Sequence, residues 1–329
     1  REHNVIFCYD DQTITISHNN FSSVVAPGTN HKLKMSTGAV DSPPKNEKTK
    51  ASLSSPDLKD SWLLRQLLSS YRSCPSFIKI GGLDFSFTIA SFLFISAFRV
   101  LFLQLLIYLG WPLRTKMTTD AASSLASIIH AALLCSWLSI FFAKLGWQNY
   151  IPSCKLSTHK DKDFQDVSTA CLQVCTGYMM FDSFWLVKDT YDLGLQPLTE
   201  FDCMVIAHHF MTSFYMTSCR VIQAGHISAM ILMLTGELSN PLMNAMFTTR
   251  FAIQLECCNS DNMMLLHSLL EHIFAIVYFV LRISIGPACA IHLSYDLLFT
   301  KQGRCNVPLH LSMIWVALVA GVLLGSGPF

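Results

Sequence analysis

The sequence predicts an all-α polytopic membrane protein with about seven transmembrane helices. Hydrophobic residues make up 51% of the chain and charged residues only 14%, a balance more apolar than that of soluble domains. Seven apolar stretches follow one another, each near the roughly 20 residues that a helix needs to cross a bilayer. Because lipid offers the backbone no hydrogen-bond partner, such stretches fold as a helical bundle.

The N-terminal residues 1–60 differ in composition from the rest of the chain. Lys, Ser, Thr, Asn and Pro dominate from His31 to Pro56, and such a stretch buries too little apolar surface to offset its chain entropy. We therefore expect a disordered tail over residues 1–60. Asn20-Phe21-Ser22 matches a glycosylation acceptor, although a three-residue match is more often unused than used.

Residues 61–82 form a separate amphipathic segment. Trp62, Leu63, Leu67 and Tyr71 recur at helical spacing, which predicts a short helix. With Trp and Tyr at headgroup level, the helix would lie in the membrane interface. A helix packed on the protein explains the same pattern, and the sequence leaves both explanations open.

The membrane domain follows in order along the chain. Residues 83–110 hold the first transmembrane helix, and residues 116–325 hold the remaining six. The predicted spans are Leu83–Leu109, Ala121–Leu145, Ser168–Val187, Asp202–Arg220, Gly225–Phe247, Met263–Ala288 and Pro308–Gly325. If the spans alternate, the basic N-terminal tail and the two most basic loops share one side, which the positive-inside rule assigns to the cytosol.

Composition and motif spacing exclude several kinds of site. The net charge of +1 leaves no basic surface for nucleic acid, and no such partner is expected. The twelve cysteines contain no CxxC pair, so a zinc motif is absent. No HExxH, HxxxH or HxxHH cluster occurs either, and we expect no metal site.

Polar residues inside apolar spans are the candidate functional residues, because ionisable groups at membrane depth are costly. Tyr178 and Asp182 stand at i and i+4 and share a helix face. A carboxyl group here must be neutral, paired or facing water. We expect its partner to be His208 or His209 on the next span.

His208 and His209 are adjacent and therefore point about 100° apart on a helix. We expect one to face the bundle interior and the other a neighbouring helix. Arg220 ends the same span, where it either snorkels to the interface or contacts lipid. His130 in the second span is a candidate lipid contact, although a helix-packing hydrogen bond is the commoner role for such a residue.

The fifth span places Glu237, Asn240 and Asn244 on one face. Pro241 removes a backbone hydrogen bond to residue 237, which predicts a kink there. Polar groups beside a broken helix line a cavity or join helices, and we favour the cavity. In the sixth span, Glu271 is expected to pair with a histidine or with Arg282.

Four sequence features, taken in their order along the chain, resemble the TLC-domain membrane family (the TRAM/LAG/CLN group), which includes the ceramide synthases. These features are His130, Gly177-Tyr178 with Asp182, His208-His209, and Glu237-Leu-Ser-Asn-Pro241. The Glu-Leu-Ser-x-Pro form is most similar to the TLC-domain-containing branch. The resemblance implies a six-helix barrel around a lipid-holding cavity, preceded by one extra helix.

The resemblance also implies roles for these residues. In ceramide synthases the paired histidines act in acyl transfer from acyl-CoA to a sphingoid amine. By position, His208 or His209 would be the general base or the nucleophile, Asp182 the orienting group and Glu237 a second acid or base. The remaining candidates are lipid contacts: Tyr178, His130, Asn240 and Arg220. Ceramide synthases carry a further His-Asp pair that is missing here, where the stretch reads Leu234-Thr-Gly-Glu-Leu-Ser-Asn-Pro241.

Three functions follow as hypotheses. The first is a membrane protein of lipid metabolism or lipid homeostasis that holds a sphingolipid, fatty acyl lipid or phospholipid. The second is an acyltransferase of the ceramide synthase type, with acyl-CoA as substrate and no bound cofactor. The third is a factor in lipid or cargo transport. Each places the protein in the endoplasmic reticulum or another endomembrane.

Overall fold

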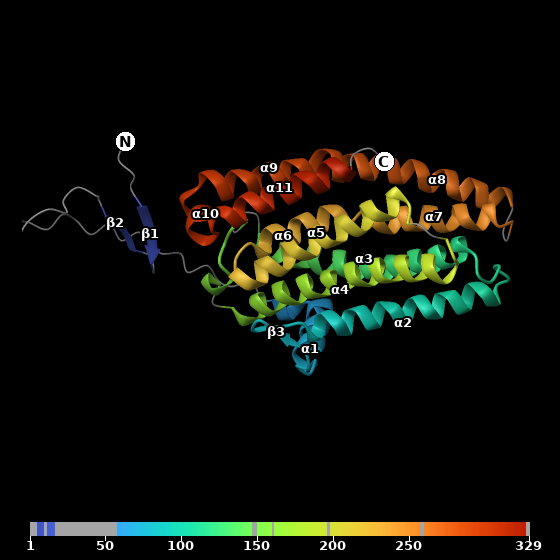
Figure 1. Cartoon of the computed structure of the whole chain (residues 1–329), viewed down its shortest axis with the longest axis horizontal. Coiled ribbons are helices and arrows are strands. Elements are labelled where there is room, and N and C mark those ends of the chain that lie inside the picture. Colours follow the sequence, from blue (N-terminus) through green and yellow to red (C-terminus); the bar gives the residue numbers. More distant parts are fainter. Residues whose placement is uncertain are drawn as a thin grey trace, which may run out of the picture. The chain divides into compact units, whose positions relative to one another are not determined.

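The computed structural model describes residues 5–9, 12–16, 58–146, 150–159, 161–195, 198–256 and 260–326. The chain divides into two compact units, Arg1–Ser54 and Ser55–Phe329. The second unit is a bundle of helices that run nearly parallel (Figure 1).

The described part of the first unit is a pair of antiparallel strands, β1 (Val5–Tyr9) and β2 (Gln12–Ile16), with Val5 opposite Ile16 and Tyr9 opposite Gln12. These strands lie within residues 1–60, for which a disordered tail as a whole stays a prediction. The expectation rested on the polar composition further along, whereas both strands are rich in β-branched and aromatic residues, which favour strands. Most of the remaining tail, with the acceptor match at Asn20, lies outside the described residues.

The amphipathic segment is a helix packed on the protein. After the short turn η1 (Leu58–Asp60), helix α1 (Trp62–Ser73) starts at Ser61, whose hydroxyl accepts from the Leu64 amide. The apolar face of α1 is buried, and the helix contacts α3 (Lys116–Leu145) and α4 (Lys162–Asp192). The structure therefore favours packing on the protein over insertion in the interface.

Arg72 fixes the end of α1 to the start of α4. Its guanidinium donates to Asp163 at 2.6 Å and to Asp166 at 2.6 Å. The hydrogen bond to Asp163 raises the pKa of Arg72 above its ordinary value most, and the hydrogen bond to Asp166 adds to the effect. A tight hairpin of β3 (Lys79–Ile80) and β4 (Leu83–Asp84) then leads into helix α2 (Ser86–Tyr108).

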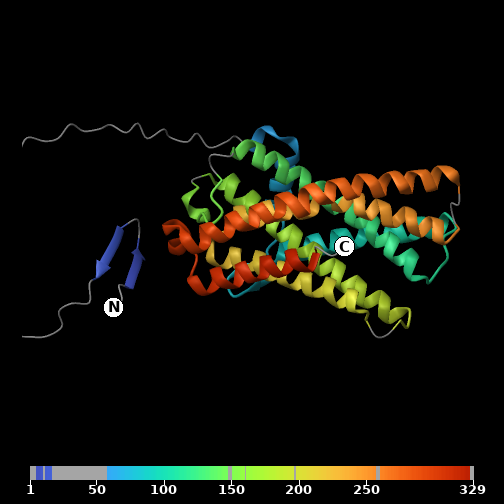
Figure 2. The ribbon, with the colours of Figure 1, turned by 90° about the horizontal axis from the view of Figure 1, so that it is seen from above.

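Six helical passes form a closed ring, and α2 lies outside it. The passes are α3; α4; α5 (Glu200–Ile222); α6 (His226–Glu237) with α7 (Asn240–Gln254); α8 (Asp261–Tyr278) with the π-helical segment η4 (Phe279–Ile285) and α9 (Gly286–Phe299); and α11 (Leu309–Ser326). Contacts run from α3 to α4, α5, α11, α9, α6 and, through α7, back to α3. Figures 1 and 2 show the elongated bundle from two directions, with its helices running along the long axis. Helix α2 packs on α3 and α4. The expected barrel of six passes with one preceding helix is confirmed.

Local sequence signals set the helix ends. Thr199 and Asp202 form a capping box at the start of α5, each side chain accepting from the other's backbone amide. Gly146 ends α3 with a φ of 74°, and Gln223 ends α5 in the left-handed region. Two short elements complete the connections, η3 (Leu156–Thr158) and α10 (Lys301–Asn306).

The passes match the predicted spans in number and order, although several helices run past the predicted ends. Within the described residues, α2, α3 and the continuous stretch Asp261–Phe299 are long and apolar enough to cross a bilayer by length and composition. That stretch is 39 residues long, much longer than the predicted Met263–Ala288, because the helix passes through Pro287 without breaking. At the predicted kink near Pro241, two residues separate α6 from α7, Leu238 and Ser239, and both keep helical backbone angles.

Candidate functional site

The ring of helices lines a cavity of about 1030 Å³ that is partly open to the outside, with walls from α3 to α11. This volume lies at the upper end of the range for small-molecule pockets, roughly 300–1000 Å³. Along α5 the lining runs from Phe201 to Met216, roughly 22 Å at 1.5 Å per residue. The wall is mainly apolar, with a group of polar residues midway, and those predicted from the sequence are Tyr178, Asp182, His208, His209, Glu237, Asn240 and Asn244.

His209 is the more buried of the two adjacent histidines and is held by α4. Its Nε2 lies 3.6 Å from Asp182 Oδ2, and its Nδ1 lies 3.2 Å from the Ser183 hydroxyl. The expected pairing of Asp182 with a histidine of the next span is therefore present. Contacts at both ring nitrogens fix the orientation of the His209 imidazole.

His208 lines the same cavity and is only partly buried. Its ring lies 5.6 Å from that of His209, at 68°. Within the described residues, its side chain has no hydrogen bond to the protein. His208 is therefore the imidazole of the pair that is available to a bound molecule.

Tyr178 separates His130 from the cavity. The two rings stack at 4.0 Å and 10°, and the Tyr178 hydroxyl donates to Ser127 Oγ at 3.2 Å. Tyr178 is part of the cavity lining, whereas His130 is not. The structure thus places His130 behind the cavity wall, where direct contact with a lipid would require Tyr178 to move.

The break between α6 and α7 brings Glu237 and Asn240 into the cavity wall. Asn240 Nδ2 donates to Glu237 Oε2 at 2.8 Å, and Asn244 Nδ2 donates to the Asn240 carbonyl at 3.0 Å. Both asparagines and Glu237 are buried. The predicted polar face of this span is therefore real, and it is turned to the cavity.

Arg282 stabilises this break, a role that the sequence did not reveal. From η4, its guanidinium donates to the Gly236 carbonyl at 2.6 Å, to Asn240 Oδ1 at 2.7 Å and to the Ser239 hydroxyl at 3.1 Å. Glu271 pairs with a histidine, one of the two expected alternatives, namely with His267 one turn earlier at 3.4 Å. The signal for Arg282 was available, because a cation inside a span needs a partner and the kink at Pro241 supplies a free carbonyl nearby.

Arg220 lies away from the cavity. It is buried, its guanidinium donates to the Asp84 carbonyl, and it sits over the Phe85 ring at 4.9 Å. Arg220 therefore joins the end of α5 to the β3–β4 hairpin. Neither snorkelling nor direct lipid contact describes its position, because the hairpin before α2 covers the side chain.

One end of the cavity is charged. Lys116 and Asp120 at the start of α3, Asp202 at the start of α5 and Arg250 near the end of α7 all line it, and Lys116 Nζ lies 4.0 Å from Asp202 Oδ1. The far part, toward Met216 and Leu232, is apolar. The cavity is therefore amphipathic along its length.

A family model described as the TLC domain (TRAM_LAG1_CLN8) matches residues 120–325. Searches of curated proteins and of solved structures each returned no match. The matched range begins in α3 and ends in α11, so it corresponds to the six-pass ring that lines the cavity. With this match over more than half of its length, the chain belongs to the TLC-domain family of integral membrane proteins.

Proposed function

We propose that the protein holds one membrane lipid in the cavity and acts in lipid metabolism or membrane lipid homeostasis. The observation that supports this most directly is the amphipathic cavity inside the ring, with a charged end, a polar middle and an apolar far part. A lipid headgroup would lie near Lys116 and Arg250, and its acyl chain along the apolar wall. The lipid class is a sphingolipid, a fatty acyl lipid or a phospholipid, and the membrane is the endoplasmic reticulum or another endomembrane.

The test is the lipid that copurifies with the protein. Gly236 lines the cavity, and a Cβ built on it would meet nothing within 4 Å, so Gly236→Phe should fill the space and reduce the bound lipid. Leu238→Phe is the matched control, because Leu238 lies two residues further, is exposed and is not part of the lining. Mass spectrometry of extracted lipid should show one enriched species, depleted in Gly236→Phe alone. Equal recovery in both variants would refute the proposal.

The geometry of His208 and His209 favours a second candidate, acyl transfer from acyl-CoA to a lipid amine. The amine nitrogen would attack the thioester carbonyl, forming the amide bond while the carbon–sulfur bond breaks. One imidazole would accept the amine proton and pass it to the departing coenzyme A thiolate. His208 faces the cavity, and Asp182 holds His209, as that role requires.

Activity separates the two candidates. The purified protein would be incubated with acyl-CoA and sphingoid base, and amide product and free thiol would be measured. His208→Ala and His209→Ala should abolish product while leaving the copurified lipid in place. If no acyl donor is consumed by the unchanged protein, lipid holding without catalysis is the function. A third candidate, lipid or cargo transport, would show as transfer of the bound lipid between vesicles.

A further inference from the structure

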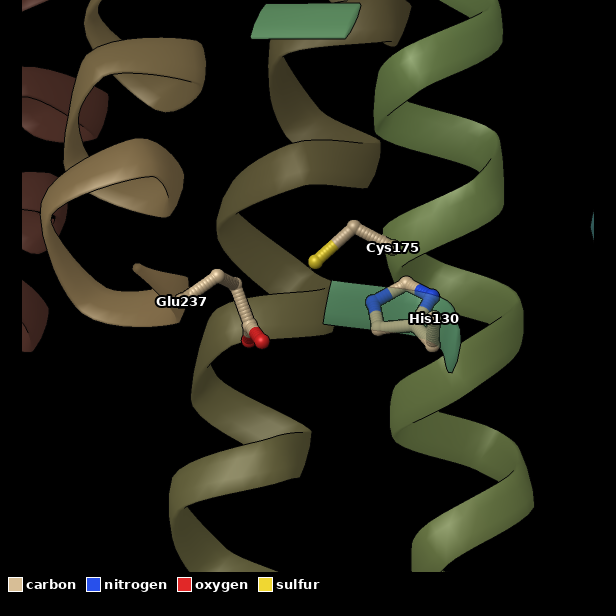
Figure 3. A group of neighbouring side chains, drawn as sticks. All are labelled: His130, Cys175 and Glu237. Atoms are coloured by element: carbon tan, nitrogen blue, oxygen red, sulfur yellow. The ribbon is translucent and has the colours of Figure 1, made fainter. Parts of the chain in front are cut away.

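Three side chains from three different helices converge behind the polar middle of the cavity. His130 comes from α3, Cys175 from α4 and Glu237 from the end of α6, and they point toward one another (Figure 3). One ligand atom from each residue, a ring nitrogen, the sulfur and a carboxylate oxygen, lies within 4.8 Å of the other two. The exposed fractions are 2%, 0% and 5%, so all three side chains are almost wholly buried.

The polar groups of this cluster are poorly satisfied by the protein. His130 Nε2 has no hydrogen-bond partner in the described part of the chain. Cys175 is a free thiol. Glu237 accepts from Asn240, but among the described residues it forms no ion pair. Buried polar groups without partners cost free energy, and a buried carboxylate costs more than a neutral group.

We propose that His130, Cys175 and Glu237 bind a zinc ion. Imidazole, thiolate and carboxylate are the three side-chain ligand types that zinc takes in proteins. The thiolate and the carboxylate together carry two negative charges, which the divalent ion neutralises. The occupied site is therefore neutral as a whole, and a neutral site is far cheaper to keep at membrane depth than an isolated charge.

The spacing fits a tetrahedral ion. Zinc–ligand bonds of about 2.0–2.3 Å place neighbouring ligand atoms about 3.5 Å apart. Small side-chain rotations on the three helices close the remaining distance. Asn240 already donates to Glu237 Oε2 at 2.8 Å, the kind of outer contact that holds a metal-binding carboxylate in place.

Three protein ligands leave the fourth position of zinc open. Cys175 and Glu237 also line the cavity, so that open position is next to the space in which a ligand lies. Zinc sites with three protein ligands and an open position are the catalytic type, whereas structural sites have four. The ion would bind an oxygen of water or of a cavity ligand there.

The experiment measures metal in the full chain, purified in detergent with an affinity tag that contains no histidine. Elemental analysis should find about one zinc per chain. Glu237→Gln, Cys175→Ser and His130→Gln should each weaken zinc binding by about tenfold or more, since changes even outside the ligand set cost about 10–100-fold. The matched controls keep the residue types and the burial: Cys171→Ser, one turn earlier on α4, and His226→Gln, a buried histidine of α6 outside the cluster.

Cobalt gives a second readout that does not depend on activity or on lipid. Co²⁺ in place of zinc should show a thiolate-to-cobalt absorption band that Cys175→Ser removes and Cys171→Ser retains. Glu237→Gln keeps the size of the side chain and its contact with Asn240, so it decides the result if another variant fails to fold. Zinc should also raise the unfolding temperature of the unchanged protein and not that of Glu237→Gln.

Two results overturn the proposal. One is a folded protein that takes up no zinc or cobalt when either metal is supplied in excess. The other is zinc that stays bound in the folded Glu237→Gln and Cys175→Ser variants, which would assign it to other residues. The metal content is measured on purified protein and does not depend on bound lipid. A protein without zinc therefore leaves the lipid proposal unaffected, and a protein that binds no lipid can still bind zinc.

Discussion

Arg99 and Asp189 form a buried ion pair between α2 and α4. Arg99 is 1% exposed, donates to Asp189 and to the Ser123 hydroxyl at 2.9 Å, and stacks on the Trp185 ring at 3.9 Å. Removing one partner of a buried pair leaves the other charge without compensation. This ion pair therefore holds α2 against α4 of the ring.

Asp189→Ala should lower the free energy of unfolding in detergent by about 3–5 kcal/mol, since Arg99 stays buried and unpaired. Asp192→Ala is the control, because its pair with Lys188 lies near the surface and such pairs contribute about 0–1 kcal/mol. The double change Arg99→Met/Asp189→Leu should recover most of the loss. Equal, small effects of both single variants would contradict the assignment.

His159 couples stability to pH in the loop before α4. Its ring stacks on Phe164 at 3.9 Å, and its Nε2 lies 3.7 Å from Cys154 Sγ. Burial lowers the pKa of His159 below its ordinary value of 6.5, against a smaller opposing effect of Asp161. The unfolded chain therefore binds the proton more readily, so stability falls as the pH drops below about 6.5 toward the folded-state pKa.

The unfolding temperature between pH 7.5 and about 5 measures this coupling. The unchanged protein should lose more stability over this range than His159→Gln, which has no proton to bind. His310→Gln is a control, since His310 is exposed. Parallel pH profiles for the unchanged protein and His159→Gln would exclude a contribution from this residue.

Sequence reasoning predicted contacts between neighbouring spans better than contacts across the ring. A partner for Asp182 was expected in His208 or His209, because a buried carboxyl group needs a partner and the next span offered these two, and the structure pairs Asp182 with His209. The cluster of His130, Cys175 and Glu237 was missed, and a metal site was not expected. Its ligands come from three helices, so no spacing motif marks them, and their convergence depends on the tertiary packing alone.

At the scale of elements, Gly177 allows α2 and α4 to approach closely. A Cβ on Gly177 would lie 2.5 Å from the Thr88 carbonyl oxygen and 3.0 Å from Ser91 Cβ. Because the first contact is backbone, the helices themselves must separate. Small residues at helix contacts serve this purpose in membrane proteins.

Gly177→Ala should destabilise the protein by about 1–3 kcal/mol, the usual cost of overpacking. Gly321→Ala in α11 is the matched control, because its Cβ would meet nothing within 4 Å and alanine is the better helix former by about 1 kcal/mol. Denaturant unfolding of both variants in detergent gives the comparison. An unchanged midpoint for Gly177→Ala would mean that α2 is not held closely in solution.

Helix boundaries could be predicted from the sequence where a local residue signal sets them. Boundaries that depend on packing between helices could not. Pro241 predicted the interruption after α6, because proline removes a backbone hydrogen bond. The π-helical segment at Phe279–Ile285 had no such signal, and it joined two helices into one long pass. The apolar face of α1 suited lipid and protein equally, and only its contacts with α3 and α4 decided between them.

At the scale of the whole molecule, the number and order of the passes were predictable because each needs a long apolar stretch. Closure of the ring was not, since it requires α7 to return to α3 and α11 to bridge α5 and α9. The family resemblance supplied that expectation. The same connectivity places the loops after α2, α4 and α7 at one end of the bundle and those after α3, α5 and α9 at the other.

The charges of these two ends predict the orientation in the membrane. The end with the loops after α3 and α9 carries Lys155, Lys162, Lys301 and Arg304, and the positive-inside rule assigns it to the cytosol. A glycosylation cassette inserted after Gly194, at the opposite end, should therefore be modified, whereas the same cassette after Gly146 should not. Both glycines lie in connections at positive φ, outside the helices. Glycosylation is detected as a shift on a gel that glycosidase treatment removes. Only lumenal sites receive the sugar, so modification after Gly146 or at Asn20 would reverse the assignment.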